Sequence, residues 1–200
     1  MDKKIRIESY RGEAVRKFIP AIAKLRMEVF REYPYLYIGD EEYEKRYLEK
    51  FITAKDAIVV VAWDKEEIIG ISTGFPFIYE AEAMQRPFLK ARLNADDFFY
   101  FGEFVLQKKY RGRGIGHQFF VLQDEHVRNL GRFKYICLCV VKRSDEDPKR
   151  PLDYKPSTKF WQDRGFVKHP ELIALYPWQE IDEDKETLKE MVFWIKQLKI

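Results

Sequence analysis

The stretch that decides the fold is KKYRGRGIGHQFF, residues 108–120, with glycines at positions 112, 114 and 116. An apolar pattern of helical spacing begins directly after it. Glycines at a strand-to-helix junction allow a tight turn, which brings several backbone N–H groups together at the positive end of the helix dipole. We therefore interpret the stretch as an anion-binding loop. Arg111 and Arg113 add charged donors, so a diphosphate is the expected occupant.

Two familiar phosphate-binding motifs do not fit this loop. The P-loop requires a lysine followed by serine or threonine after its last glycine, and neither is present. The dinucleotide fingerprint requires G-x-G-x-x-G at the first strand-to-helix turn, whereas this stretch has another glycine order and lies late in the chain.

The flanking segments place the loop between a strand and a long helix. FFYFGEFVLQ, residues 98–107, is too aromatic for a surface loop and runs directly into the glycines. Beyond them, a helix that ends at Gly131 is predicted. Its apolar face follows from the spacing of Ile115, Phe119, Leu122, His126 and Leu130. KYICLCVV, residues 134–141, is the continuous apolar run expected of an interior strand.

The remaining periodicities complete a mixed sheet with helices on its faces. The expected elements are a strand at 5–10, a helix over 15–30 that Pro20 kinks or divides, a second helix capped by Asp40, a hairpin at 57–75, a helical excursion at 78–97, a short helix at 157–165, and strands at 172–178 and 191–198.

Composition favours one globular domain, residues 1–200. Apolar residues make up 46% of the 200, and 36 basic residues against 33 acidic ones give a net charge of +3. This excess of positive charge is too small to indicate a nucleic-acid partner. No run approaches the roughly 20 apolar residues of a membrane span, and MDKKIRIESY lacks a leader's apolar core, so we expect a cytoplasmic protein without a membrane partner.

The cysteines and histidines do not indicate a metal site. Cys137 and Cys139 lie two apart on one strand, too far for a disulfide, and are expected to be core thiols. The three histidines are scattered, and His126, on the apolar face of the long helix, is expected to be a satisfied core residue.

Two motifs carry a resemblance to a known family. R-x-x-G-x-G, from Arg111 to Gly116, resembles the pyrophosphate-binding motif of the GNAT superfamily of acyl-CoA-dependent N-acetyltransferases. KFWQDRGF, residues 159–166, is similar to that family's aromatic-aromatic-x-x-x-Gly-Phe signature. The resemblance covers roughly residues 5–198 and implies an α/β (α+β) fold of GNAT type, with a mostly antiparallel sheet of about seven strands and helices on both faces.

The resemblance implies where acetyl-CoA, the expected cosubstrate, would lie. The strand before the glycines would splay from its neighbour after a bulge and pair with the pantetheine arm, while the peptide N–H of Val105 or Leu106 would face the thioester carbonyl. The implied cosubstrate-binding residues are Phe104, Val105, Leu106, Gln107, Arg111, Gly112, Arg113, Gly114, Ile115, Gly116, His117, Phe160 and Trp161. For His117, contact with the pyrophosphate and a place on an exposed polar face stay open.

Glu103 is the candidate general base, because acyl transfer to an amine needs a group that takes the ammonium proton. It is the only acidic residue in FFYFGEFVL, and apolar neighbours are expected to raise its pKa toward neutrality. The alternative is a carboxylate at a strand bulge satisfied by a backbone or arginine partner.

The candidate acid is Tyr154, since Trp161 stands where the family commonly has a tyrosine, and an indole cannot return a proton to a thiolate. A phenol with a pKa near 10 suits a thiolate leaving group. A tyrosine that packs a proline-bracketed loop explains Tyr154 equally well.

The acceptor, a small-molecule or peptide amine, is expected in a groove lined by residues 31–43 and 75–84. The tyrosines and acidic residues of the first segment suit a cationic or amphipathic amine: Tyr33, Tyr35, Tyr37, Glu32, Asp40, Glu41 and Glu42. Two further alternatives stay open. The protein can bind CoA without turnover as a sensor or interaction module, and the aromatic terminal strands can form a homodimer face as readily as a core.

Overall fold

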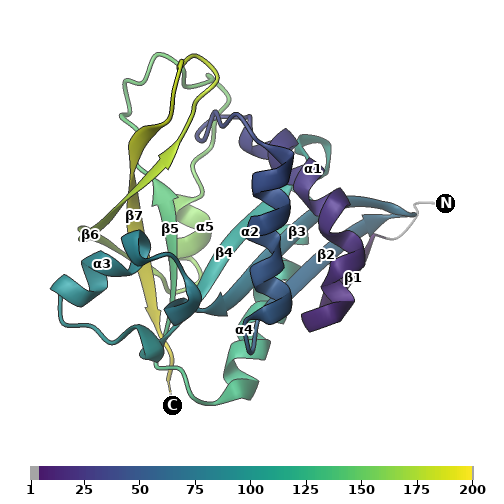
Figure 1. The fold of residues 1–200 in the computed structure, drawn as a ribbon, viewed down its shortest axis with the longest axis vertical. Coiled ribbons are helices and arrows are strands. Elements are labelled where there is room, and N and C mark those ends of the chain that lie inside the picture. Colours follow the sequence, from purple (N-terminus) through teal and green to yellow (C-terminus); the bar gives the residue numbers. More distant parts are fainter. Residues whose placement is uncertain (1–4, 200) are drawn as a thin grey trace.

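The computed structural model describes residues 5–199 and contains one seven-stranded sheet in the order β1-β2-β3-β4-β5-β7-β6 (Figure 1). Its strands are β1 (Arg6–Tyr10), β2 (Ile58–Asp64), β3 (Glu67–Pro76), β4 (Phe98–Leu106), β5 (Tyr135–Val141), β6 (Val167–Trp178) and β7 (Thr187–Gln197). Every neighbouring pair is antiparallel except β4 and β5. The predicted fold class is confirmed.

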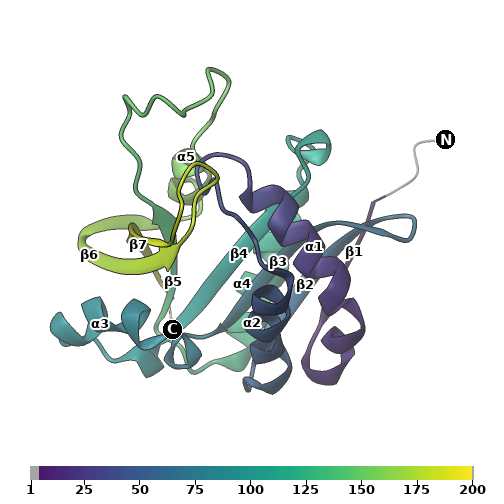
Figure 2. The same ribbon diagram turned by 45° about the horizontal axis from the view of Figure 1, so that its top comes forward.

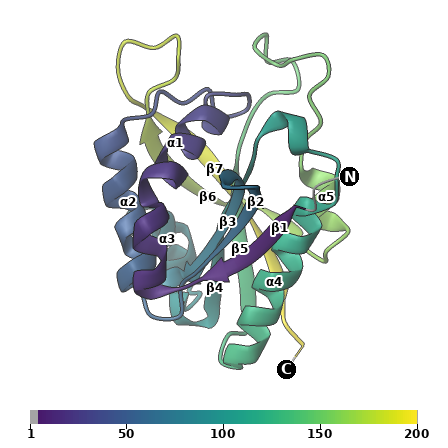
Figure 3. The same cartoon turned by 90° about the vertical axis from the view of Figure 1, so that its right-hand side faces the viewer.

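Helices cover both faces of the sheet (Figure 3). The α-helices are α1 (Ile19–Phe30), α2 (Glu41–Thr53), α3 (Glu82–Lys90), α4 (Ile115–Leu130) and α5 (Thr158–Gln162), with short 3₁₀ turns at Gly12–Phe18, Phe77–Tyr79, Ala95–Asp97 and Lys108–Tyr110. Helices α1, α2 and α3 lie on one side, while α4 and α5 lie on the other. Two apolar clusters fill the layers, one centred on Phe51 and Phe75 and the other on Phe99 and Phe119.

Local signals in the sequence set most element boundaries. Pro20 lies in the first turn of α1, so it divides the predicted first helix into a 3₁₀ turn and an α-helix. Asp40 caps α2 as predicted, because its side chain accepts a hydrogen bond of 2.7 Å from the Tyr43 N–H. Strands β6 and β7 begin earlier than expected, at Val167 and Thr187, because pairing with each other extends them through polar residues.

The centre of the sheet is split, and this split creates the candidate site. Strands β4 and β5 pair only from Phe98 to Tyr100 and then diverge, which Figure 1 shows as an opening V. At the start of the divergence, Gly102 is the extra residue of a bulge against β3. A Cβ at Gly102 would lie 2.8 Å from Thr73 Oγ1, so only glycine fits here without a shift. The expected splay and bulge are therefore present.

No helix within residues 5–199 is long and apolar enough to cross a membrane. The expectation about a leader rests partly on residues 1–4, which lie outside the described residues.

Candidate active site

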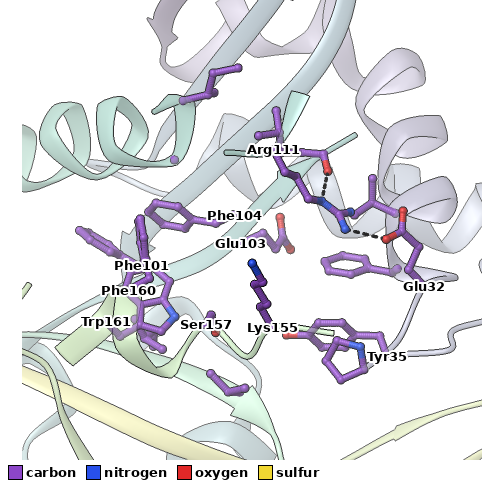
Figure 4. Close-up of a pocket in the computed structure, with 18 of the residues that line it drawn as sticks. Glu32, Tyr35, Phe101, Glu103, Phe104, Arg111, Lys155, Ser157, Phe160 and Trp161 are labelled. Atoms are coloured by element: carbon purple, nitrogen blue, oxygen red, sulfur yellow. Dashed lines mark hydrogen bonds and ion pairs between the residues drawn. The ribbon is translucent and has the colours of Figure 1, made fainter. Parts of the chain in front are cut away.

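A cavity of about 590 Å³ occupies the gap between β4 and β5, and we call it the central cavity (Figure 4). One end is formed by the glycine loop and the first turn of α4. The other end is formed by the α1–α2 loop, residues 31–40, and the loop between β5 and α5, residues 142–157. Figure 2 shows these two loops at the same end of the sheet. Ten of the predicted cosubstrate-binding residues line the cavity: Phe104, Leu106, Arg111, Gly112, Gly114, Ile115, Gly116, His117, Phe160 and Trp161.

The glycine loop has the backbone conformation that an anion cradle needs. Gly112 and Gly114 have φ values of 77° and 80°, in the left-handed region that side chains disfavour. Gly114 is also the N-cap of α4, and it offers no side chain to satisfy the free N–H groups of the first turn. These N–H donors lie at the N-terminal end of α4, which borders the cavity and where the helix dipole is positive.

The two arginines of the loop differ in their contacts. Arg111 donates from Nε to the Leu106 carbonyl at 3.0 Å and from Nη1 to Glu32 at 2.7 Å, so its guanidinium spans the mouth of the cavity (Figure 4). The guanidinium carbon of Arg113 lies 5.3 Å from the Tyr110 ring centre, and the residue does not line the cavity. The elements of the loop that line the cavity are therefore its glycine backbone and the Arg111 cation, which is paired with Glu32.

The open edge of β4 presents alternate peptide groups. The Gln107 N–H donates to the Ile69 carbonyl of β3 at 3.0 Å, and β3 and β4 stay in register from Glu103 to Leu106. Because peptide groups alternate along a strand, the Val105 N–H turns toward β3, whereas the peptide groups of Phe104 and Leu106 turn toward the gap. The Leu106 carbonyl, bound by Arg111, points the same way.

Glu103 lies on the cavity wall in an ionic environment rather than the apolar one expected from its neighbours in sequence. Its carboxylate forms an ion pair with Arg26 of α1 and accepts a hydrogen bond of 3.0 Å from Thr73 Oγ1. Arg26 also pairs with Glu44 of α2, which is fully buried. The guanidinium carbon of Arg26 lies 4.4 Å from the centre of the Tyr47 ring. No local pattern could reveal this, because the partners lie far from Glu103 in sequence.

Tyr154 lines the cavity from the loop before α5, and the helix begins at Thr158, after Pro156. Its ring packs edge-on against Tyr33 of the α1–α2 loop, with ring centres 4.7 Å apart. Burial, followed by the nearby Tyr33, raises the pKa of Tyr154, so it is a proton donor at neutral pH. Trp161 is buried against Phe104 and Phe166.

The acceptor end contains part of the predicted segment. Glu32, Tyr33 and Tyr35 line the cavity, whereas Tyr37, the acidic residues 40–42 and residues 75–84 do not. Burial raises the pKa of the Tyr35 phenol well above its ordinary value, so it stays protonated.

Ion pairs join the loops of the acceptor end. Arg143 donates to the Pro34 carbonyl at 2.7 Å and to Glu180 at 2.6 Å, and Lys149 donates to Glu180 at 3.1 Å. Glu180 is only 2% exposed, so this clamp fixes the α1–α2 loop and the β5–α5 loop to the β6–β7 turn.

Sequence reasoning missed three polar residues of the cavity: Lys155, Ser157 and Arg164. Arg164 donates to His117 Nδ1 at 3.2 Å, and its guanidinium carbon lies 3.5 Å from the centre of the Phe160 ring. The arginine lies inside the KFWQDRGF motif, whose spacing was a usable signal. Lys155 and Ser157 lie in an irregular loop, and no sequence pattern marked them as cavity residues.

Of the three residues predicted to belong to the core, His126 and Cys137 are buried, whereas Cys139 is only half-buried. His126 Nε2 lies 2.8 Å from the Asp56 carbonyl, and burial lowers the pKa of the ring. Cys139 borders the cavity, but burial raises the pKa of its thiol to about 12, which keeps it protonated and unreactive near neutrality.

No protein-family model matches the sequence, and no curated protein matches it significantly. Solved structures do resemble the fold. An N-acetyltransferase from Staphylococcus aureus Mu50 superposes with a TM-score of 0.62 at 13% identity, covering 98% of this chain and 99% of that one. Ribosomal-protein-alanine N-acetyltransferase from Brucella melitensis gives 0.61 at 14% identity, covering 96% and 99%.

A third similar structure is PaiA N-acetyltransferase from Thermoplasma acidophilum in complex with coenzyme A, with a TM-score of 0.55, 12% identity and coverage of 98% and 99%. The chain therefore shares the fold of these N-acetyltransferases, and the expected fold is confirmed.

Proposed function

We propose that residues 1–200 form one GNAT-like acyltransferase domain that moves an acetyl group from acetyl-CoA to a primary amine. The observation that carries this proposal is the continuity of the central cavity, which joins the free N–H groups of the glycine loop to the open edge of β4 and to Glu103. The N-acetyltransferases of the same fold support it.

The residues of the cavity fit a CoA-type cosubstrate. The positive-φ glycines and the N-terminus of α4 suit its diphosphate, and the unpaired edge of β4 suits the amides of its pantetheine arm. When bound, acetyl-CoA supplies the activated acetyl thioester. Of the two predicted donors to the thioester carbonyl, we favour the Leu106 N–H, because the alternation of β4 turns it toward the gap.

In this mechanism Glu103 receives the proton of the acceptor ammonium. Arg26 and Thr73 fix its carboxylate at the cavity wall, where an amine entering past Tyr33 and Tyr35 meets it. Tyr154, protonated at neutral pH and held against Tyr33, gives a proton to the departing thiolate. The attack of the deprotonated amine on the thioester precedes the departure of this thiolate, and the acetyl group passes directly to the amine without an acyl-enzyme.

A second candidate function is a sensor or interaction module that binds CoA or acyl-CoA without turnover. The Arg26–Glu103 ion pair favours it, because a carboxylate that is satisfied by an arginine partner is the alternative to a catalytic Glu103. Trp161 at the usual tyrosine position favours it as well.

The test begins with the thermal midpoint in saturating acetyl-CoA, free CoA and ATP. A ligand at 100 times its dissociation constant adds about 2.7 kcal/mol of apparent stability. Stabilisation by both CoA species but not by ATP supports CoA binding at the glycine loop. Thiol release from acetyl-CoA is then measured with a panel of small-molecule and peptide amines, and this release separates an enzyme from a sensor. Absence of any shift with CoA would contradict both functions.

A further inference from the structure

Lys155 is the only lysine that lines the central cavity within the described residues. It lies in PLDYKP, residues 151–156, directly after Tyr154 and before Pro156. Proline restricts the backbone of the preceding residue to extended conformations, while the Tyr154 N–H donates to the Pro151 carbonyl at 3.0 Å. The Tyr154 ring is fixed against Tyr33. Lys155 is therefore presented from an anchored position rather than from a free loop.

The side chain of Lys155 points into the cavity, with its ammonium directed toward Glu103 and lying between Tyr35 on one side and Ser157 and Trp161 on the other (Figure 4). Other lysines near this end are paired, since Lys108 bonds with Asp153 and Lys149 with Glu180 and Asp182. Lys155 has no ion-pair or hydrogen-bond partner among residues 5–199. A primary amine therefore lies in the cavity and is directed toward the proposed base.

We propose that Lys155 is a self-acetylation site, modified by the active site of its own chain. This inference rests on the proposed function. The Lys155 ammonium gives up one proton to Glu103, and its nitrogen then attacks the thioester carbon of acetyl-CoA. The C–N bond forms, the C–S bond breaks, and the nitrogen loses its second proton. Tyr154 protonates the thiolate, so the products are acetyl-Lys155, free CoA and one released proton.

An intramolecular reaction has a kinetic signature. Because amine and cosubstrate share one cavity, the rate follows a first-order course that does not change with protein concentration. Lysines outside the cavity that are acetylated by random collision have no such advantage, and their reaction does not depend on Glu103. Lys159 is the matched control, because it is exposed like Lys155 but pairs with Asp163 at 3.0 Å and does not line the cavity.

The experiment incubates the full chain with acetyl-CoA alone and measures the intact mass over time, with the modified residue located by peptide mapping. We expect one acetyl group per chain at Lys155, at a rate that stays constant across a wide range of protein concentration. Lys155→Arg is expected to abolish this modification, Lys159→Arg to leave it unchanged, and Glu103→Gln to slow it by about 100-fold. The thermal shift with free CoA is expected to persist in Lys155→Arg.

The outcomes separate this inference from the proposed function. If acetyl-CoA stabilises the protein and an external amine is acetylated while Lys155 stays unmodified, self-acetylation is wrong and the function stands. Equal labelling of Lys155 and Lys159, insensitive to Glu103→Gln, also overturns the inference, because it identifies solution chemistry. If acetyl-CoA gives neither a thermal shift nor any acetylation, the proposed function itself fails.

Discussion

Arg26 of α1 forms a buried ion pair with Glu103 of β4, and the side chains of both residues are only 7% exposed. The same guanidinium pairs with Glu44 of α2, so two carboxylates share one cation beneath the helical layer. A buried charge left without a partner is costly, which makes this cluster both a structural element and the support of the proposed base.

Glu103→Gln tests the catalytic role of the carboxylate. Glutamine keeps the size of the side chain but cannot accept the ammonium proton, so the rate of thiol release with an active amine should fall by about 100-fold or more. The thermal shift produced by free CoA should persist. An unchanged rate with affinity and fold intact would show that another group is the base.

Arg26→Met should destabilise the fold by about 3–5 kcal/mol, because it leaves Glu44 and Glu103 buried without their shared cation. Urea unfolding measures this change. Arg16→Met is the matched control: Arg16 pairs with Glu13 and Glu49 at an exposed site, where loss of an ion pair costs under about 1 kcal/mol. Equal, small effects in the two variants would contradict the buried cluster.

Substitutions in the glycine loop should separate folding from binding. Gly114→Ala forces a side chain into a positive φ and should cost about 1–2 kcal/mol of stability. Gly116→Ala, inside α4, meets only the Phe160 ring at 3.6 Å, so the fold should tolerate it. Its Cβ nevertheless stands in the cradle and should weaken CoA binding. Unfolding in urea and titration with CoA check the two effects, and full CoA affinity in Gly116→Ala would argue against the cradle.

Glu32→Gln should increase the affinity for CoA. Glu32 holds the Arg111 guanidinium at 2.7 Å, and its neutral replacement frees that cation for the diphosphate. An exposed pair of this kind is worth up to about 1 kcal/mol, so a gain of up to about fivefold is expected by calorimetry. Glu42→Gln removes the same charge from an exposed site outside the cavity and should have no effect. A lower affinity in Glu32→Gln would mean that the ion pair positions Arg111 for binding.

Stability should decline in mild acid because of His126. Burial lowers the pKa of its ring below the ordinary value of 6.5, so the unfolded chain binds more protons than the folded one in the interval between the two values. The stability contributed by neutral His126 is therefore fully present above pH 6.5 and is lost as the pH falls from 6.5 to the lowered pKa of the folded state. Unfolding free energies at about pH 7.5 and about pH 5.5 should differ less in His126→Gln than in the natural chain. Equal differences would assign the acid sensitivity to other groups.

The sequence alone determined the order of elements and the place of the glycine loop, because those features depend on local chemistry. Glycines at positive φ, the Asp40 cap, Pro20 at a helix start and the apolar face of α4 each act within a few residues. Such signals do not depend on what the rest of the chain does.

Only the tertiary structure decided the chemistry around that loop. The sequence indicated apolar surroundings for Glu103, yet Arg26 reaches it from α1, far along the chain. The direction of the β4 peptide groups follows from pairing with β3, and the position of Lys155 follows from loops that Arg143 and Glu180 hold together. Charge pairing and strand register join residues distant in sequence, and no local pattern encodes which distant groups will meet.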